Sequence, residues 1–454
     1  MNRTDSNFSF FDARCVTQAA RPSVLRQRTQ AACLAAGMAV GLMVLATNAT
    51  NAIAQSAPAA ASAPTATASA PTVRPELAKP LQAAQEALKA GNYKDALVRV
   101  AEAEAIPALT PYEAYVVQRL KAPAAFGTGD VNAALAIFVK VLESPLMPTA
   151  DRTPVMETTI KLALQQKDYA LAARQMSTYF AESGSNAEIR RLYPQVLSVL
   201  GDHAGVLREL APQVAADEAA KRYTPEATLR LLAASQSALK DMTAYTGTLE
   251  KLATSTGKVD YWAELISRLA RRDGFADERL RLDVYRLRRA VGATLDAGEL
   301  GDMAFRAQQV GLPAEAQQLL QEGFASGLLG RDANAAADKK LLEQTTKATN
   351  LDRGTLADGE ASALKAKDGN AAFGLGLAVS STGAHERALT LMTQAVAKGG
   401  LRRPDDAMLH LGVVQWRAGK LDDAQRSFVA VKGLDGVADL ARLWGLFLSS
   451  PARK

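Results

Sequence analysis

The stretch Gly91-Asn92-Tyr93-Lys94-Asp95-Ala96 places a turn residue shortly before an alanine, and this pattern decides the fold because it recurs. Two further copies are Gly129-Asp130-Val131-Asn132-Ala133-Ala134 and Lys167-Asp168-Tyr169-Ala170-Leu171-Ala172. Fainter or shorter copies follow at Gly201-Asp202-His203, Lys240-Asp241-Met242, Gly311-Leu312-Pro313, Gly383-Ala384-His385 and Gly419-Lys420-Leu421. A chain with such internal repetition is predicted to be a repeat protein.

The spacing of the copies indicates helical hairpins. The marker positions Ala96, Ala134, Ala172, Val206 and Tyr245 are 38, 38, 34 and 39 residues apart. Three later markers are Ala316, Ala388 and Ala424, and the last two are 36 apart. A large apolar residue follows each marker by four positions: Val100, Phe138, Met176, Leu210, Leu249, Leu320, Met392 and Phe428. Spacings of three and four are helical, and periods of this size are typical of helix-turn-helix arrays.

Two units also carry a glycine twelve residues before the marker, in Leu375-Gly376 and Leu411-Gly412. With the turn and the marker alanine, this pattern resembles the tetratricopeptide repeat (TPR) superfamily over about Leu77 to Phe447. The resemblance implies an all-α fold, a right-handed α-solenoid of about eight to ten stacked antiparallel hairpins. The segments Thr110-Pro111-Tyr112-Glu113-Ala114-Tyr115 and Tyr261-Trp262-Ala263-Glu264-Leu265 are similar to uncharacterised exported proteins of the bacterial envelope in this superfamily.

Three regions depart from the repeat. Pro123 is expected to kink or shorten its helix, because proline removes a backbone hydrogen bond. The stretches 259–289 and 331–367 are helical in pattern but lack a clear marker, so they are interpreted as degenerate hairpins. The final apolar helix is expected to cap the solenoid with Leu440, Leu443, Trp444, Leu446 and Phe447.

The N-terminal region predicts export. Residues 1–54 combine early arginines, an apolar run from Ala31 to Ala46 and the small-residue site Ala52-Ile53-Ala54, a pattern typical of a cleaved signal peptide. Residues 55–76 are rich in Ala, Pro, Ser and Thr and predict a disordered linker, and residues 77–454 form the predicted solenoid. Both cysteines, Cys15 and Cys33, precede the cleavage site. A periplasmic location is expected.

The composition argues against several classes of function. The formal net charge of +6 falls to about +3 once the leader is removed, too balanced for a nucleic-acid-binding protein. The three histidines, His203, His385 and His410, are isolated, and no metal-binding spacing or phosphate-binding glycine loop occurs. We therefore expect no enzyme activity, no catalytic residues, no metal and no cofactor.

The TPR resemblance nominates a concave groove as the binding surface. Its pattern of first-helix positions selects Asn370, Phe373, Asp406, Leu409, Val413, Trp416 and Arg417 as candidate partner-binding residues. Phe373 and Trp416 suit a core role as well as they suit binding. The expected function is a non-catalytic protein-binding scaffold of the bacterial cell envelope.

A second candidate surface is the arginine-rich stretch 268–289, which holds eight arginines and four acids. The candidate patch consists of Arg268, Arg271, Arg272, Arg281, Arg288 and Arg289. It predicts an envelope accessory that contacts polysaccharide, peptidoglycan or a membrane surface. The alternative is an outer face neutralised by its own acids. Sequence leaves the partner and the oligomeric state open.

Overall fold

The structure is a computed structural model that describes residues 72–331 and 333–453. Within these residues it contains twenty α-helices, α2 to α21, and no strand, which confirms the all-α prediction. The predicted signal peptide, 1–54, and residues 55–71 of the predicted linker lie outside the described residues. The first described helix begins at Pro75, two residues before the predicted solenoid boundary. The described residues divide into two compact units, with the boundary between Pro212 and Gln213.

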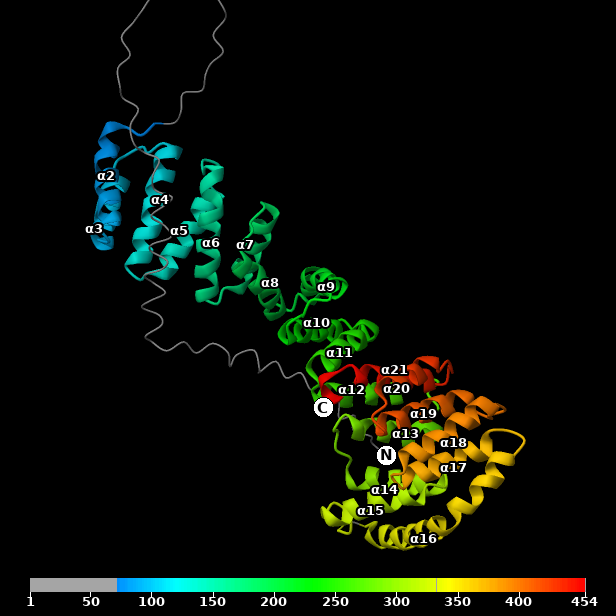
Figure 1. The fold of residues 1–454 in the computed structure, drawn as a ribbon. Coiled ribbons are helices and arrows are strands. Elements are labelled where there is room, and N and C mark those ends of the chain that lie inside the picture. Colours follow the sequence, from blue (N-terminus) through cyan, green and yellow to red (C-terminus); the bar gives the residue numbers. More distant parts are fainter. Residues whose placement is uncertain (1–71, 332, 454) are drawn as a thin grey trace, which may run out of the picture. The chain divides into compact units, whose positions relative to one another are not determined.

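The described part of the first unit is a row of helices in which contacts run between neighbours (Figure 1). Its helices are α2 (Pro75–Lys89), α3 (Tyr93–Glu104), α4 (Pro111–Gly127), α5 (Val131–Glu143), α6 (Thr149–Gln165), α7 (Tyr169–Ala181) and α8 (Ala187–Val199). Helix α9 (His203–Ala219) runs across the boundary between the units. The pairs α2 with α3, α4 with α5, and α6 with α7 form hairpins with short connections.

The recurring sequence pattern is the hairpin turn itself. Gly91, Gly129, Gly201, Gly383 and Gly419 all have a positive φ, the backbone conformation in which a helix commonly ends. Lys167 and Lys240 adopt it too, with φ of 59° and 61°. Aspartate then begins several of the next helices: the side chains of Asp130, Asp168, Asp202 and Asp241 each accept a hydrogen bond from a backbone N–H three residues on. The turn therefore ends one helix and starts another.

The markers lie where the two helices of a hairpin meet. All eight are buried, as is the large apolar residue four positions after each. A side chain added at Gly376 would lie 2.5 Å from Met392 Cγ, and one at Gly412 would lie 2.5 Å from Phe428 Cε1. The glycines thus allow the close approach of helices that the sequence pattern predicts.

The second unit contains helices from α10 to the C-terminus. They are α10 (Glu226–Ala238), α11 (Met242–Thr256), α12 (Val259–Ala270), α13 (Asp277–Ala290), α14 (Ala297–Gln309), α15 (Pro313–Ala325), α16 (Ala335–Lys365), α17 (Asn370–Ser381), α18 (His385–Lys398), α19 (Pro404–Arg417), α20 (Leu421–Ala430) and α21 (Val437–Leu448), with a short 3-10 helix, η3 (Pro451–Arg453). Hairpins are formed by α10 with α11, α14 with α15, α17 with α18, and α19 with α20.

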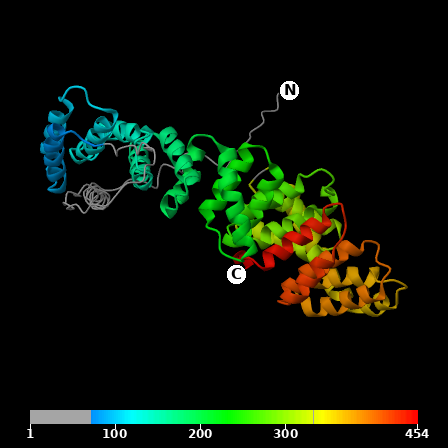
Figure 2. The same ribbon diagram turned by 90° about the horizontal axis from the view of Figure 1, so that it is seen from above.

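The C-terminal helices of this unit return to its earlier helices. Helix α21 packs on α19 and α20, as expected of a cap, but it also contacts α12 and α13, and η3 contacts α11. Trp262 of α12 and Phe447 of α21 pack edge to face with ring centroids 6.2 Å apart. Figure 2 shows α21 in red against the green helices of the same unit. The second unit therefore closes on itself.

Two local expectations are corrected. Helix α4 continues to Gly127, beyond Pro123, so of the two expected outcomes, a kink or an early end, the early end is wrong. The stretch 331–367 is not a hairpin, because it contains one helix of 31 residues, α16. No turn residue interrupts that helix, and its glycines, Gly354 and Gly359, have nothing within 4 Å of an added side chain. Among the described helices, none combines the length and apolar character needed to cross a membrane.

Candidate binding site in the second unit

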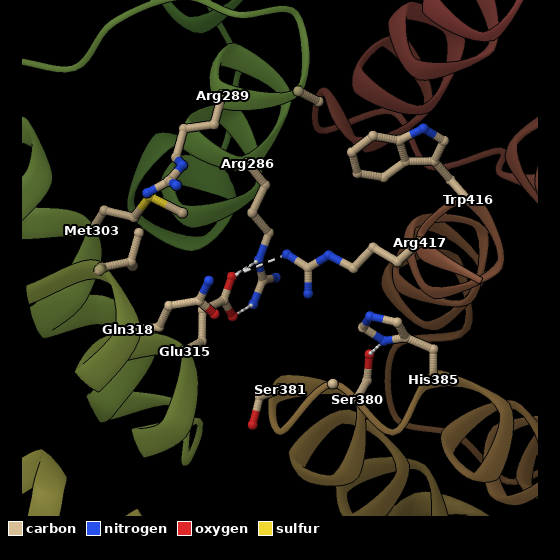
Figure 3. Close-up of a pocket in the computed structure, with 13 residues that line it drawn as sticks. Arg286, Arg289, Met303, Glu315, Gln318, Ser380, Ser381, His385, Trp416 and Arg417 are labelled. Atoms are coloured by element: carbon tan, nitrogen blue, oxygen red, sulfur yellow. Dashed lines mark hydrogen bonds and ion pairs between the residues drawn. The ribbon is translucent and has the colours of Figure 1, made fainter. Parts of the chain in front are cut away.

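The second unit contains a cavity of about 690 Å³ between α13 to α15 on one side and α17 to α19 on the other. A volume of this size is within the range of small-molecule and peptide-anchor sites. Its lining combines three arginines and one glutamate with neutral polar, apolar and aromatic residues (Figure 3). The lining residues are Arg286, Arg289, Ala290, Met303, Glu315, Gln318, Leu319, Ser380, Ser381, Gly383, His385, Trp416 and Arg417. The closure of the unit brings together residues that are far apart in the sequence: Arg286 and Arg417 are separated by 131 residues.

The wall of the cavity is a buried network of ion pairs centred on Arg286. Its guanidinium donates to Glu315 through Nε at 3.0 Å and Nη2 at 2.5 Å, and to Asp283 through Nη1 at 2.8 Å. His410 Nε2 lies 3.0 Å from Asp283 Oδ2. Burial raises the pKa of Glu315, but the charge of Arg286 and its hydrogen bonds outweigh burial and lower the pKa to about 2. The carboxylate is therefore ionised at neutral pH.

The pKa of Asp283 follows the same balance. Burial opposes ionisation, while His410 and Arg286 together hold the pKa well below its usual range. The pKa of Arg286 is raised, because Glu315 and Asp283 offset the cost of burying its charge. A buried charge with two counter-ions and several hydrogen bonds is the arrangement in which such a network can be stable.

Arg417 lines the same cavity, but its positive charge is much less well neutralised by acidic side chains than that of Arg286. Its Nη2 donates to Glu315 Oε1 at 3.3 Å, and that oxygen already accepts a shorter bond from Arg286 Nε. Burial lowers the pKa of Arg417, and the positive charges of Arg286 and Arg289 lower it further, against the attraction of Glu315. About 28% of its side chain is accessible, so the guanidinium borders the cavity. Figure 3 shows it pointing from α19 toward Glu315 and Arg286.

His385, Ser380 and Ser381 line the opposite side of the cavity. Ser380 Oγ lies 3.1 Å from His385 Nδ1, and Ser381 Oγ donates to the carbonyl of Ala378. Burial lowers the pKa of His385, and the positive charge of Arg417 lowers it further. The imidazole is therefore held neutral beside the arginine. The sequence places His385 only in a turn and gives no sign of this pairing.

Trp416 has two roles in the structure. It lines the cavity, and its ring centroid lies 5.1 Å from that of Trp444 and 5.9 Å from that of Phe447, both on α21. Trp444 in turn stacks on Phe428 with centroids 5.8 Å apart. Removing Trp416 would therefore disturb the docking of α21 as well as the cavity wall.

The other five groove candidates are not among the residues that line this cavity. Phe373, Leu409 and Val413 are buried. Phe373 therefore has the core role that its sequence position also allowed, and Leu409 and Val413 are not exposed to a partner. Asn370 Nδ2 donates to the carbonyl of Gly400, and its Oδ1 accepts from the backbone N–H of Arg402. Asp406 pairs with Arg279. Of the seven candidates, Trp416 and Arg417 line the cavity.

The arginine-rich stretch is mostly occupied by internal ion pairs. Five of the six candidate patch residues have an acidic partner in the described structure: Arg268 with Glu264, Arg272 with Asp439, Arg281 with Asp277, Arg288 with Glu299, and Arg289 with Glu322. Arg271 is exposed. Arg279, which was not a candidate, joins α13 to Asp406 and Asp435 near the C-terminus. Arg272 and Arg279 thus connect the stretch to the C-terminal part of the unit, whereas the other pairs lie within α12 or among α13 to α15.

Sequence reasoning missed Asp283, Arg286 and Glu315. One signal was available: Asp283 and Arg286 interrupt the apolar run of α13 between Leu280 and Leu287, so opposite charges three residues apart fall on a buried face. Their partner Glu315 directly precedes the marker Ala316, but its pairing with Arg286 follows from the tertiary fold. Within the described residues, no group of three His, Cys, Asp or Glu side chains could hold a metal ion.

Comparison with known proteins adds only general similarity. No protein-family model matches the chain, and no curated protein matches it. Among solved structures it is similar to a tetratricopeptide repeat protein from Parabacteroides merdae (11% identity, TM-score 0.27, covering 77% of this chain and 98% of that one). Two others are Naa15/Naa10 bound to HypK-THB (13%, 0.29, 80% and 65%) and yeast Tom70 (12%, 0.23, 81% and 94%).

TM-scores below 0.5 say nothing about a partner or an activity. The helical repeat is visible in the chain itself, in the positive-φ turns, the buried markers and the close approaches at Gly376 and Gly412. The described chain is an all-α array of TPR-like hairpins.

Proposed function

We propose that this chain is an exported, non-catalytic binding module of the bacterial envelope, which holds a protein partner through the cavity of its second unit. The observation that carries the proposal is the cavity itself, where Arg417 presents a weakly compensated charge beside the aromatic surface of Trp416. Arginine and tryptophan are the residue types that most often anchor protein partners. The signal-peptide pattern of residues 1–54 supports export to the periplasm.

The proposal is tested by crosslinking in the intact envelope, followed by recovery of the chain and identification of bound proteins. Arg417→Gln is the informative variant, because it removes the charge while leaving the aromatic packing around Trp444 in place. Arg426→Gln is the matched control, since Arg426 lies on α20 with 73% of its side chain exposed and does not line the cavity. Loss of one protein partner in the first variant alone supports the proposal.

The competing surface role predicts a different result. If the arginine-rich stretch bound glycan or membrane, Arg271→Gln would reduce recovery of lipid or polysaccharide, and recovery would fall steeply with salt. An unchanged set of partners in Arg417→Gln together with that loss would overturn the cavity proposal. Cell fractionation and N-terminal sequencing of the processed chain test export separately, and a chain retained in the cytoplasm would contradict the proposed location.

A further inference from the structure

The cavity is short of negative charge next to Arg417. Three arginines line it, and the acidic side chain among the lining residues is Glu315. Arg289 pairs with Glu322 at 2.7 Å, so its charge is matched. Arg286 and Arg417 share Glu315, and the second carboxylate of the network, Asp283, also contacts His410. Two carboxylates are therefore shared as ion-pair partners among two guanidinium groups and one histidine.

The hydrogen bonds are distributed just as unevenly. Arg286 holds both oxygens of Glu315 and one oxygen of Asp283. The hydrogen bond of Arg417 in the described structure is a single 3.3 Å contact to an oxygen that Arg286 already uses. A guanidinium has five N–H donors arranged to grip a planar oxyanion, so most of the donors of Arg417 remain available on the cavity side.

The neutral lining is suited to the rest of such a ligand. Gln318 and Ser381 add polar groups at the cavity wall, and Trp416 adds an aromatic one. The space, about 690 Å³, exceeds what a lone inorganic ion would fill. An anion with an attached organic body would use both the charge and the aromatic surface.

We infer that the cavity binds an oxyanion group, a carboxylate or a phosphate carried on an organic body, with Arg417 as its main contact. This inference rests on the proposed function, since it specifies what the binding cavity recognises. The group has two sources: a free small organic acid, or an acidic side chain of a protein partner. In either case the anion completes the pairing that Glu315 provides only in part.

The first experiment measures binding of benzoate to the purified protein by calorimetry, with benzamide as the neutral molecule of the same shape. Inorganic phosphate tests the second oxyanion. We expect benzoate or phosphate to bind with saturation, and benzamide to bind about tenfold more weakly or not at all, because a hydrogen-bonded charge is lost. Arg417→Gln should weaken benzoate or phosphate binding by about tenfold or more, while Arg426→Gln should leave it unchanged.

A second readout needs no variant. The sequence contains three histidines, so their imidazole signals can be assigned by NMR. The positive charge of Arg417 contributes to the lowered pKa of His385. An anion bound to Arg417 should therefore raise the pKa of His385. If neither oxyanion shifts His385, or if benzamide and benzoate bind equally, the inference is wrong.

The two sources are separated by a peptide of four glutamates and its glutamine counterpart. Tighter binding of the acidic peptide than of benzoate assigns the anion to a protein partner, and binding of the free acids alone assigns it to a small molecule. If crosslinking recovers a protein partner through Arg417 while no oxyanion probe binds, this inference fails and the proposed function stands. If the oxyanions bind and no protein partner is recovered, the inference stands and the proposed function fails.

Discussion

Helices α2 to α8 of the first unit and helices α10 to α21 of the second are built from the same hairpin, but their long-range contacts differ. In the first set, the ion pair between Arg74 and Glu113 spans 39 residues. In the second, Arg442 pairs with Glu250 across 192 residues and Arg279 with Asp435 across 156. The first set is a linear array in which each helix depends on its neighbours, whereas the second is closed by its own C-terminus.

Closure accounts for the cavity. A linear array buries its core between consecutive helices and leaves its polar faces in solvent. When α19 and α21 return to α12 and α13, polar side chains on facing helices are enclosed together, and they must then find partners. The Arg286 network and the poorly matched Arg417 are consequences of that enclosure.

The largest effect is expected from Arg286→Gln. This change leaves Asp283 and Glu315 buried without their principal cation and should cost about 3–5 kcal/mol of unfolding free energy in the second unit. Amide hydrogen exchange should accelerate in α13, α15 and α19, while α2 to α8 remain protected. Equal acceleration in both regions would show that closure does not make the second unit a separate cooperative unit.

Arg417→Gln is the matched comparison within the same network. Because Glu315 keeps both of its bonds to Arg286, and because Arg417 is poorly compensated, we expect a change of less than about 1 kcal/mol in either direction. Chemical denaturation of the two variants in parallel measures the difference. Similar destabilisation by both would mean that Arg417 is as well paired as Arg286.

Trp444→Ala should be nearly as severe. Trp444 of α21 is fully buried against α19 and α20, and removing a buried tryptophan costs about 3–5 kcal/mol. In a closed unit, the loosening should also appear in α12, where Trp262 packs against Phe447. Met176→Ala is the counterpart in the linear array, expected to cost about 2–5 kcal/mol and to affect only α6 to α8. Hydrogen exchange that stays local in both variants would contradict closure.

The repeat could be predicted from sequence because its determinants are local. A turn residue with positive φ, a capping aspartate and a buried alanine act within a few residues of one another, as at Lys167, Asp168 and Ala172. The long helix α16 was missed for the same reason, since a weak pattern without a marker does not distinguish one helix from two. Local signals are thus enough to predict the regular hairpins, but not the places where a single long helix replaces a hairpin.

The candidate site could be predicted only in small part. Trp416 and Arg417 were selected by their position in the repeat, and both line the cavity. Glu315 lies 102 residues from Arg417, and the return of α19 to α13 and α15 depends on ion pairs and aromatic contacts spread over the whole unit. Periodicity carries no information about such distant pairings. The arginine-rich stretch was therefore open to interpretation as a free surface.

A smaller effect is expected at two glycines of α17. Gly376 lies at a close contact between helices, whereas Gly374 has no neighbouring atoms at the position of an added side chain. Gly376→Ala would place a methyl group 2.5 Å from Met392 Cγ and 3.2 Å from the carbonyl oxygen of Ala388, so we expect a loss of about 1–3 kcal/mol. Gly374→Ala meets nothing within 4 Å and should gain about 0.5–1 kcal/mol through higher helix propensity. Urea denaturation distinguishes the two signs, and a stable Gly376→Ala variant would show that the helices can separate.

The most local effect should come from acidifying the edge of the linear array, at Glu113 of α4. Its carboxylate accepts hydrogen bonds from the side chain of Arg74 and from the backbone N–H groups of Thr110 and Arg74, which lower its pKa to about 2. The unfolded value is near 4.3. Since the folded pKa is the lower one, this contribution to stability is complete above about pH 5 and is lost as the pH falls through about 2.

Carbon NMR of the Glu113 carboxyl measures that titration directly, and Glu113→Gln should remove the acid sensitivity of the contact between α2 and α4 without affecting the second unit. A carboxyl that titrates near its unfolded value would mean that Arg74 does not hold it in solution. Because Arg74 is partly exposed and lies at the start of the described array, we expect local loosening of α2 in acid and continued folding of α5 to α8. In the closed second unit, by contrast, we expect the loss of one ion pair to loosen helices beyond the two that it joins. The extent of the loosening therefore distinguishes the two regions.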